Sequence, residues 1–418
     1  MFREIAACRL CGNPELFSIL HMGEQYLTGV FPKSPDQPLS RGPLELVKCH
    51  SATGAEHCGL VQLRQSYDLA EMYGPNYGYR SSLNKSMIAH LSDVVRKVTS
   101  NVSVGKGDLV LDIGSNDGTL LSNYPAGGAT LVGMDPSAER FRKYYRPDIE
   151  LVVDFFPQGL AKAGFGNRKA KIITSIAMFY DLEEPLKFSQ QVADLLDDEG
   201  VWHFEQSYLP TMLEMNSYDT ICHEHVEYYS LRQIKWITDR VGLKIIDVEL
   251  NDINGGSFAI TVAKQGSRHQ PAESVIRSIT EREQQMRLDE LSPFESFKAN
   301  IERPKHDLLK LLDDIKRRGE TVIGYGASTK GNVILQYCGI TADRLPYIAE
   351  VNEDKFGCHT PGTNIPIISE AQAREMKPDY YLVLPWHFRE NLIKREAAFL
   401  AGGGKMIFPL PNVEIVGA

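Results

Sequence analysis

Four cysteines near the N-terminus have the spacing of a metal site. They are Cys8, Cys11, Cys49 and Cys58. Four thiolates satisfy the tetrahedral preference of Zn²⁺ and leave no open position for catalysis, so we expect a structural zinc ion. The second cysteine pair is wider than usual, which leaves His50 or His57 open as a ligand and free buried cysteines as the alternative. Residues 1–80 are rich in turn residues, and a segment of that kind needs such a metal to fold.

A nucleotide-binding turn is indicated by the sequence VLDIGSNDGT, which begins at Val110. Its Asp-x-Gly-x-x-x-Gly spacing differs from the Gly-x-Gly-x-x-Gly of dinucleotide enzymes, and this favours S-adenosylmethionine (SAM) over NAD. Asp135 ends the next expected strand, where a carboxylate accepts hydrogen bonds from ribose hydroxyls, and Asp154-Phe155 is placed to meet the adenine. The residues expected to bind SAM are Asp112, Gly114, Ser115, Asn116, Gly118, Asp135, Pro136, Asp154, Phe155 and Ile176.

His223-Glu224-His225 follows the fifth expected strand of this region, where SAM enzymes receive their acceptor. A histidine is suited to abstracting a proton near neutral pH, and a neighbouring carboxylate can orient it. Adjacent positions point in alternating directions, which disfavours a shared metal ion. We therefore expect Glu224 and His225 to be catalytic, against the alternative of ordinary surface or core residues.

Two further segments could hold a substrate. The sequence GYGASTKGN, which begins at Gly324, follows a strand and opens a helix, so Ser328 and Lys330 could bind a phosphate; a purely structural turn is the alternative. The sequence EMYGPNYGYRSSLN could stack on a base or simply join two domains. Its candidate substrate-binding residues are Tyr77, Tyr79, Arg80, Ser81 and Asn84.

These motifs need elements to position them, and the composition predicts several domains. The chain has 418 residues and a net charge of −9, which disfavours a nucleic-acid surface. No apolar run approaches the roughly 18 residues needed to span a membrane. We expect a cytoplasmic monomer with a zinc-binding domain over 1–80, a SAM domain over 81–272 and a C-terminal Rossmann-like domain within 273–418. Seven cysteines in a long intracellular chain are not expected to form a disulfide framework.

Short apolar runs alternate with helix-sized segments in two regions, which predicts two doubly wound α/β sheets with a ligand cleft between them. The first region covers about 108–265, and the second begins at Thr321. Residues 81–101 have helical periodicity and are expected to form a linker helix. Residues 273–318 are expected to be a helical connection with breaks at Pro293 and Pro304.

With these motifs in place, the chain resembles the SAM-dependent sugar C-methyltransferases, which act on nucleotide-linked 4-keto-deoxy sugars. The resemblance spans nearly the full length. It rests on the cysteine pairs followed by CGLVQL, and on YGYRSSLN, LDIGSNDG, HEHVEYYS, NGGSF and GYGASTKGN. It implies a zinc domain, a central class I methyltransferase fold and a C-terminal Rossmann-like domain that helps to hold the nucleotide sugar.

The resemblance also implies that His225 is the base. It would remove the proton next to the ketone, and the resulting enolate would attack the methyl group of SAM. Cys222 and Asn254 join the expected substrate site through the same motifs. Cys222 stands where tyrosine is frequent in the family, and Tyr180-Asp181 where histidine is frequent. Open alternatives are transfer to oxygen or to a non-nucleotide acceptor, epimerisation of the keto sugar, and a binding module without catalysis.

Overall fold

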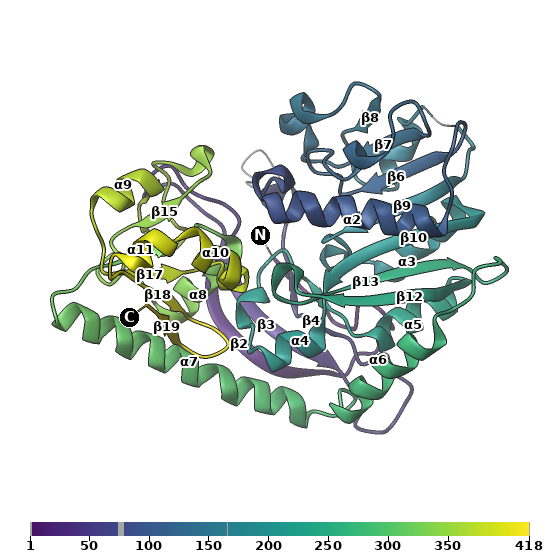
Figure 1. The fold of residues 1–418 in the computed structure, drawn as a ribbon. Coiled ribbons are helices and arrows are strands. Elements are labelled where there is room, and N and C mark those ends of the chain that lie inside the picture. Colours follow the sequence, from purple (N-terminus) through teal and green to yellow (C-terminus); the bar gives the residue numbers. More distant parts are fainter. Residues whose placement is uncertain (1, 74–78, 165, 418) are drawn as a thin grey trace.

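A mixed sheet of seven strands lies at the centre of the protein, whose computed structural model describes residues 2–73, 79–164 and 166–417 (Figure 1). The strand order is β12-β13-β10-β9-β6-β7-β8. The bounds are β6 Leu109–Ile113, β7 Thr130–Met134, β8 Ile149–Val152, β9 Ala170–Ile176, β10 Leu196–Ser207, β12 Leu243–Asn251 and β13 Ser257–Lys264. Strands β6 to β10 pair in parallel, and β13 is antiparallel to both β10 and β12. The strand order reverses at β6, with β7 and β8 added on one side of it and β9 and β10 on the other, which confirms the expected doubly wound topology.

Alternate side chains of these strands pack into hydrophobic cores on opposite faces of the sheet. This explains why the strands are apolar along nearly their whole length. In β6, Leu111 packs into the core on one face of the sheet and Val110 into the core on the other. Both side chains are fully buried. A strand covered on both faces must be apolar throughout, which is why these runs could be recognised in the sequence.

Helix α2, Lys85–Asn101, is the expected linker helix, but it lies against the central sheet (Figure 1). Its residues Met87, Leu91 and Val95 pack in one cluster with Val110 of β6. The side chain of Asn84 caps the helix by accepting a hydrogen bond from the backbone N–H of Ser86 at 2.9 Å. The helix is therefore one layer of the central domain.

The remaining helices of the central region are α3 Pro185–Leu195, α4 Leu209–Glu214 and α5 Leu231–Arg240. Short 3₁₀ turns carry residues of the site: η1 Ser81–Leu83, η5 Phe179–Asp181, η6 Tyr218–Thr220 and η7 Ile253–Gly255. The turn η5 follows β9, and η6 follows α4 in the segment that leaves the central sheet after β10. No helix among the described residues is long and apolar enough to cross a membrane.

One strand of the N-terminal sheet comes from the middle of the chain. Its order is β11-β4-β3-β2, with β2 Leu16–Tyr26, β3 Arg41–Cys49, β4 Val61–Leu63 and β11 Glu227–Tyr228. Strand β11 is antiparallel to β4, and the N–H of Leu63 donates to the carbonyl of Val226 at 2.9 Å. A small ribbon of β1 Arg3–Glu4 and β5 Gln65–Ser66, and helix α1 Leu69–Met72, complete this region. The segment that directly follows His225 therefore belongs to the N-terminal sheet.

A second sheet of six strands forms the C-terminal part, in the order β16-β15-β14-β17-β18-β19. The bounds are β14 Val322–Tyr325, β15 Ile348–Glu350, β16 Ile367–Ser369, β17 Tyr380–Val383, β18 Lys405–Phe408 and β19 Glu414–Val416. Only β19 pairs antiparallel. The helices are α8 Thr329–Cys338, α9 Glu370–Glu375, α10 Arg389–Arg395 and α11 Ala397–Ala401, with the turn η9 Trp386–Phe388 after β17. This sheet confirms the expected Rossmann-like arrangement.

The helical connection consists of α6 Glu273–Gln285 and α7 Ser292–Arg317, and it corrects one expectation. Pro293 lies in the first turn of α7, where its missing N–H has no helical partner to lose. Pro304 lies inside α7 without ending it, so the predicted break there is wrong. The apolar face of α7, including Ile301 and Leu308, is buried in the core shared with the C-terminal sheet, and this packing outweighs one lost hydrogen bond.

The three sheets share their cores. Strands β2 and β3 lie between the two larger sheets, and α7 runs along one side of the molecule (Figure 1). Leu46 of β3, Tyr218 of η6 and Leu335 of α8 belong to one hydrophobic cluster. Cys49 and Cys58 belong instead to the cluster of the central sheet. The N-terminal region thus packs against both of the others.

Candidate functional site

The four N-terminal cysteines lie together in the fold. Their sulfur atoms are all within 4.8 Å of one another, and no two of them form a disulfide. Two sulfur pairs, Cys8 with Cys58 and Cys11 with Cys49, are each 3.5 Å apart. A tetrahedral zinc ion with Zn–S bonds of about 2.3 Å sets its sulfurs about 3.8 Å apart. The cluster therefore fits Zn²⁺ with a closed shell.

Backbone and side-chain donors support the cysteine sulfurs. The N–H of Leu60 donates to the sulfur of Cys58, and the amide of Asn13 donates to that of Cys49, each at 3.4 Å. Donors of this kind stabilise thiolates and fix their direction. His50 and His57 are not part of the four-sulfur group, so the structure favours the all-cysteine ligand set over the histidine alternative.

A cavity of about 610 Å³ opens at the carboxyl ends of β6, β7 and β8. All residues expected to bind SAM line it except Gly118. They are Asp112, Gly114, Ser115, Asn116, Asp135, Pro136, Asp154, Phe155 and Ile176. Gly118 lies behind them against Tyr145, and a Cβ atom at Gly118 would come within 2.9 Å of that ring.

The turn after β6 is held by the carboxylate that ends β7. Asp135 accepts the N–H of Asn116 at 2.8 Å on one oxygen, and the N–H of Ser137 at 2.7 Å on the other. Gly114 has φ +76°, and a Cβ atom there would lie 3.1 Å from Met178, so glycine is required where the backbone approaches the cavity. These bonds fix the turn after β6 against the end of β7 at the cavity wall.

Electrostatics differ between the acidic residues of the cavity. Burial raises the pKa of Asp112 to about 7, although the hydroxyl of Thr174 donates to it at 2.6 Å. The Lys162 ammonium, 2.6 Å from Asp154, keeps the pKa of that carboxyl below its ordinary value. Phe155 beside it is 42% exposed, which is unusual for a phenylalanine and leaves its ring available to an apolar ligand face.

Some residues of the segment before α2 line the cavity, and another caps the helix. Tyr79 and Ser81 line the SAM cavity, and the N–H of Ser81 donates to the side chain of Asn116 at 3.0 Å. Arg80 lies over the ring of Tyr144, 4.5 Å from its centre. Asn84 is occupied as the cap of α2. Tyr77 lies outside the described residues.

His225 is held in one tautomer by a backbone carbonyl. Its Nδ1 lies 3.0 Å from the carbonyl oxygen of Thr220, and because a carbonyl can only accept, Nδ1 carries the proton. Burial, together with the charge of Lys330, lowers the pKa of His225 to about 3, so the ring is neutral near pH 7. Its Nε2 is then the atom that can accept a proton. The ring centre of Tyr180 lies 4.2 Å from that of His225. In the sequence, Tyr180 stands between Met178 and Asp181, which line the cavity.

The neighbours of His225 in the chain are buried and differ in role. Glu224 accepts from the hydroxyl of Thr28 at 3.3 Å, and burial raises its pKa. Cys222 is fully buried beside Glu224, and burial holds its pKa well above the ordinary value. The Nε2 of His223 donates to the carbonyl of Gln25 at 3.2 Å, and this residue is fully buried, which is the position of a structural histidine.

Two cavity residues lie in segments that the sequence already indicated, although neither was among the expected site residues. Tyr73 and Asp181 both line the cavity, and the hydroxyl of Tyr73 donates to Asp181 Oδ2 at 2.6 Å. Burial holds the pKa of Asp181 well above its ordinary value. The other Asp181 oxygen is buried without a hydrogen-bond partner among the described residues. Tyr73 belongs to the segment EMYGPNYGYRSSLN, and Asp181 ends the turn η5 after β9, at the position where the resembled family often has histidine.

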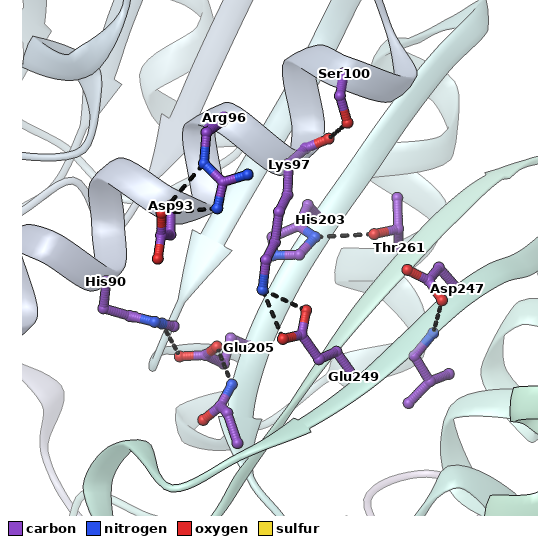
Figure 2. A network of polar contacts seen from close by, with 12 residues as sticks. His90, Asp93, Arg96, Lys97, Ser100, His203, Glu205, Asp247, Glu249 and Thr261 are labelled. Carbon is purple, nitrogen blue, oxygen red and sulfur yellow. Dashed lines mark hydrogen bonds and ion pairs between the residues drawn. The ribbon is translucent and has the colours of Figure 1, made fainter.

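A polar network between α2 and the sheet was also missed. His90 Nε2 lies 2.8 Å from one oxygen of Glu205, and the amide of Asn251 donates to the other oxygen at 2.7 Å (Figure 2). Glu205 is nearly fully buried at the carboxyl end of β10. His203, two residues before it, is bonded to the hydroxyl of Thr261 at 2.9 Å. These contacts join residues from four elements, so no local spacing could reveal them.

The C-terminal turn uses its polar groups partly for structure. Ser328 caps α8 by accepting the N–H of Gly331 at 3.0 Å. The ammonium of Lys330 donates to the carbonyl of Asn254 in η7, which joins the C-terminal sheet to the central one. A Cβ atom at Gly255 would lie 3.4 Å from His387 and 3.8 Å from Lys330, so both side chains converge on this turn.

Three family models match consecutive parts of the chain. Residues 8–73 match a model described as "Putative zinc binding domain". Residues 87–248 match a methyltransferase domain, and residues 252–411 match a C-methyltransferase C-terminal domain. The order of the three matches follows the order of the cysteine cluster, the SAM cavity and the second sheet.

The chain is also similar to characterised proteins. C-methyltransferase NovU from Streptomyces niveus is 29% identical over 428 residues, with 100% of this chain and 98% of the relative covered. A SAM-dependent methyltransferase from Clostridium acetobutylicum matches with a TM-score of 0.32 and 14% identity, over 43% of this chain and 92% of its own. LepI, solved in complex with SAM, matches with a TM-score of 0.34 and 14% identity, over 44% and 54%.

The strand order, the acidic cavity at the strand ends and the matched domains define a SAM-dependent methyltransferase of the class I fold. Its cofactors are SAM and a structural zinc ion. Within that class, the chain matches the models of a zinc-binding domain and of a C-methyltransferase C-terminal domain, and over its full length it is similar to C-methyltransferase NovU.

Proposed function

We propose that this C-methyltransferase acts on a nucleotide-linked 4-keto-deoxy sugar, with His225 as the base. The observation that carries the proposal is the bond from His225 Nδ1 to the carbonyl of Thr220. It leaves Nε2 unprotonated in a ring that burial keeps neutral. A carbon atom can accept a methyl group only after it loses a proton, and a ketone makes the neighbouring C–H acidic enough for a histidine to remove it.

Proton transfer to His225 creates a pair of opposite charges. The imidazolium and the enolate attract each other strongly in a buried site, because little water screens them. This attraction offsets the low pKa that His225 has before the substrate reacts, and it stabilises the enolate as it forms. Glu224 and Asp181 add two buried carboxyl groups whose pKa burial raises, and both groups can form hydrogen bonds with the sugar.

The SAM cavity supplies positioning for the second half of the reaction. We assign the adenosine moiety of SAM to Asp135 and Phe155, and we place the turn at Gly114 beside the cofactor, since these residues line one cavity. SAM supplies a methyl group on a sulfonium centre that a carbon nucleophile attacks in line. Holding the two reactants in this geometry is the main contribution of the protein to that step.

Lys330 supports a nucleotide-linked acceptor. Its ammonium lies between the two large sheets, where it contacts η7 and lowers the pKa of His225 and His387 through its charge. A lysine in this position can hold a diphosphate through the hydrogens that it does not donate to Asn254. Ser328, which caps α8, contributes to the same turn.

The test uses methyl-labelled SAM and a panel of dTDP-, GDP-, UDP- and CDP-linked 4-keto-6-deoxy sugars, with His225→Asn alongside the wild type. We expect a gain of one methyl on one acceptor, at carbon by NMR, and a loss of at least about 100-fold in kcat in the variant. His223→Asn is the matched control, because it changes the other histidine of the same motif.

Three outcomes would contradict the proposal. Methylation at oxygen would show a different acceptor atom, and solvent deuterium uptake without methylation would show epimerisation or exchange only. No transfer to any member of the panel, with SAM binding intact by calorimetry, would exclude the nucleotide keto sugars that were supplied.

A further inference from the structure

We infer that the C-terminal sheet positions the base of the central domain through the hydrogen bond between Trp386 and Asp219. The inference rests on the proposed role of His225. In this arrangement Trp386 holds Asp219, the next residue Thr220 presents its carbonyl, and that carbonyl fixes the ring of His225. Trp386 and Asp219 are therefore positioning residues, and neither touches the reacting atoms.

The first link joins two parts of the chain that are far apart in sequence. The indole N–H of Trp386 donates to Asp219 Oδ2 at 2.8 Å. Asp219 is fully buried and Trp386 is 5% exposed, so water does not compete for this bond. Trp386 begins η9, directly after β17 of the C-terminal sheet, whereas Asp219 is the middle residue of η6. A hydrogen bond to a buried carboxyl group is among the stronger ones in proteins.

The second link runs through one backbone carbonyl. Thr220 follows Asp219 directly, and its oxygen accepts from His225 Nδ1 at 3.0 Å and from the hydroxyl of Tyr228 at 3.3 Å. The direction of this carbonyl sets both the tautomer and the orientation of the His225 ring. A rotation of η6 would turn the carbonyl away and allow the proton to move to Nε2, the atom that must be free.

The turn η6 is short, and the C-terminal helix α8 holds its other side. The hydroxyl of Tyr218 lies 3.4 Å from the sulfur of Cys338, and its ring centre lies 5.0 Å from that of Tyr337. Three consecutive residues of η6 thus contact three different partners. Tyr218 contacts α8, Asp219 contacts η9, and the carbonyl of Thr220 contacts His225. The C-terminal domain fixes η6 from two directions.

The indole N–H of Trp386 is important for Asp219 because this buried carboxyl group has few other partners. Its second oxygen has no hydrogen-bond partner among the described residues. Burial raises the pKa of Asp219, and the positive charge of Lys330 and the bond from Trp386 oppose this. Without the indole N–H, both oxygens would lack a partner, and a buried carboxyl group in that state is strongly destabilised.

The test compares Trp386→Phe, which keeps an aromatic ring and removes the N–H, with Trp202→Phe. Trp202 also donates one buried indole bond, to Ser175 at 2.8 Å, but lies in the central sheet away from η6. The readout is the tautomer of His225 in histidine-labelled full-length protein, followed by long-range proton–nitrogen NMR and assigned with His225→Asn. We expect the Nδ1-protonated form in the wild type and in Trp202→Phe, and a mixture of tautomers in Trp386→Phe.

Kinetics provide the second readout. We expect kcat to fall about tenfold in Trp386→Phe, while the KM for SAM changes less than about twofold, because the cofactor cavity is untouched. Asp219→Asn keeps an oxygen that accepts from the indole, and should retain most of the activity, whereas Asp219→Ala should behave like Trp386→Phe.

An unchanged His225 tautomer in a folded Trp386→Phe protein would overturn the inference. Equal losses in Asp219→Asn and Asp219→Ala would also overturn it, since the hydrogen bond would then not be the cause. If Trp386→Phe fails to fold, the two Asp219 variants decide the question alone. The NMR readout does not depend on turnover, so a failed inference is distinguishable from a failure of His225 as the base.

Discussion

The hydroxyl of Tyr73 donates a hydrogen bond of 2.6 Å to the carboxyl group of Asp181, and both residues line the cavity at the carboxyl ends of β6, β7 and β8. Tyr73 ends the region matched by the zinc-binding model, and Asp181 ends the turn η5 after β9. The bond therefore ties the N-terminal region to the wall of the cofactor site.

Removing this bond should weaken cofactor binding. In Tyr73→Phe the carboxyl group of Asp181 loses its donor, and its pKa should rise further because the hydrogen bond opposes the effect of burial. SAM is positively charged, so a less ionised wall attracts it less. We expect the Kd for SAM to rise about fivefold, equivalent to about 1 kcal/mol, by titration calorimetry.

Tyr67→Phe is the control for that variant. Its hydroxyl donates to the carbonyl of Pro43 at 2.7 Å, in the N-terminal region and outside the cavity. The substitution removes one comparable tyrosine bond, so equal losses of SAM affinity in the two variants would show a general loss of stability and not a contact at the cofactor site.

Asp135→Ala should abolish most SAM binding. The substitution leaves the N–H groups of Asn116 and Ser137 without their acceptor and removes the carboxylate from the cavity. Hydrogen bonds to charged groups contribute about 1.5 to 3 kcal/mol each, so we expect affinity to fall on the order of 100-fold. The Kd for S-adenosylhomocysteine should change in parallel.

Glu350→Ala provides a matched control, because Glu350 has the same role in the second sheet. It accepts the N–H of Ala327 at 2.7 Å and that of Asn352 at 2.8 Å. Affinity for SAM should stay within about twofold of the wild type. A similar loss in both variants would contradict the assignment of SAM to the central cavity.

Cys11→Ser should release zinc and destabilise the N-terminal region. A structural zinc ion contributes on the order of 10 kcal/mol to the folding of small zinc domains, and loss of one of four ligands removes a large part of it. We expect the metal content by mass spectrometry to fall from one zinc per chain to near zero, with a lower Tm. Cys358→Ser, in the C-terminal part, should keep both values.

The buried histidines should make the protein less stable in acid. Burial lowers the pKa of His203 to about 4, whereas an unfolded histidine titrates near 6.5. Between these values the unfolded chain binds more protons, so this histidine contributes a loss of stability as the pH falls from 6.5 to 4, of at most about 1.4 kcal/mol per pH unit.

His203→Gln isolates that contribution, because other buried groups titrate with the opposite sign. Burial raises the pKa of Asp112 to about 7 and that of Glu227 to about 8, so both favour the folded state in acid. Urea unfolding of the two proteins at several pH values should give a stability difference that shifts in favour of the variant as the pH falls. A constant difference from pH 6.5 to 4 would show that His203 accepts a proton in the fold.

The sequence allowed good predictions where one local pattern carries the information. The strands around Val110 and Ile173 were recognisable because they are apolar throughout, and Gly114 and Asp135 because the turn fixes their spacing. The cysteine cluster was recognisable for the same reason: zinc ligands come in spaced pairs.

Other features depend on contacts that no local pattern contains. The periodicity of α2 indicated a helix but not that its apolar face covers the central sheet. Pro304 signals a break in any isolated helix, and only the packing of Ile301 and Leu308 explains why α7 continues. Asp181 and Trp386 act through partners more than a hundred residues away in the chain, so their positions follow from the tertiary structure alone.

The place of β11 in the N-terminal sheet affects how the protein can be made. Strand β4 lies between β3 and β11, so the N-terminal sheet is incomplete until Tyr228 has left the ribosome, long after the cysteines have been synthesised. A recombinant piece that stops before β11 would expose the edge of β4, and open strand edges are templates for aggregation. Expression and refolding therefore require the chain through β11, and the zinc-binding region is not a module that can be excised.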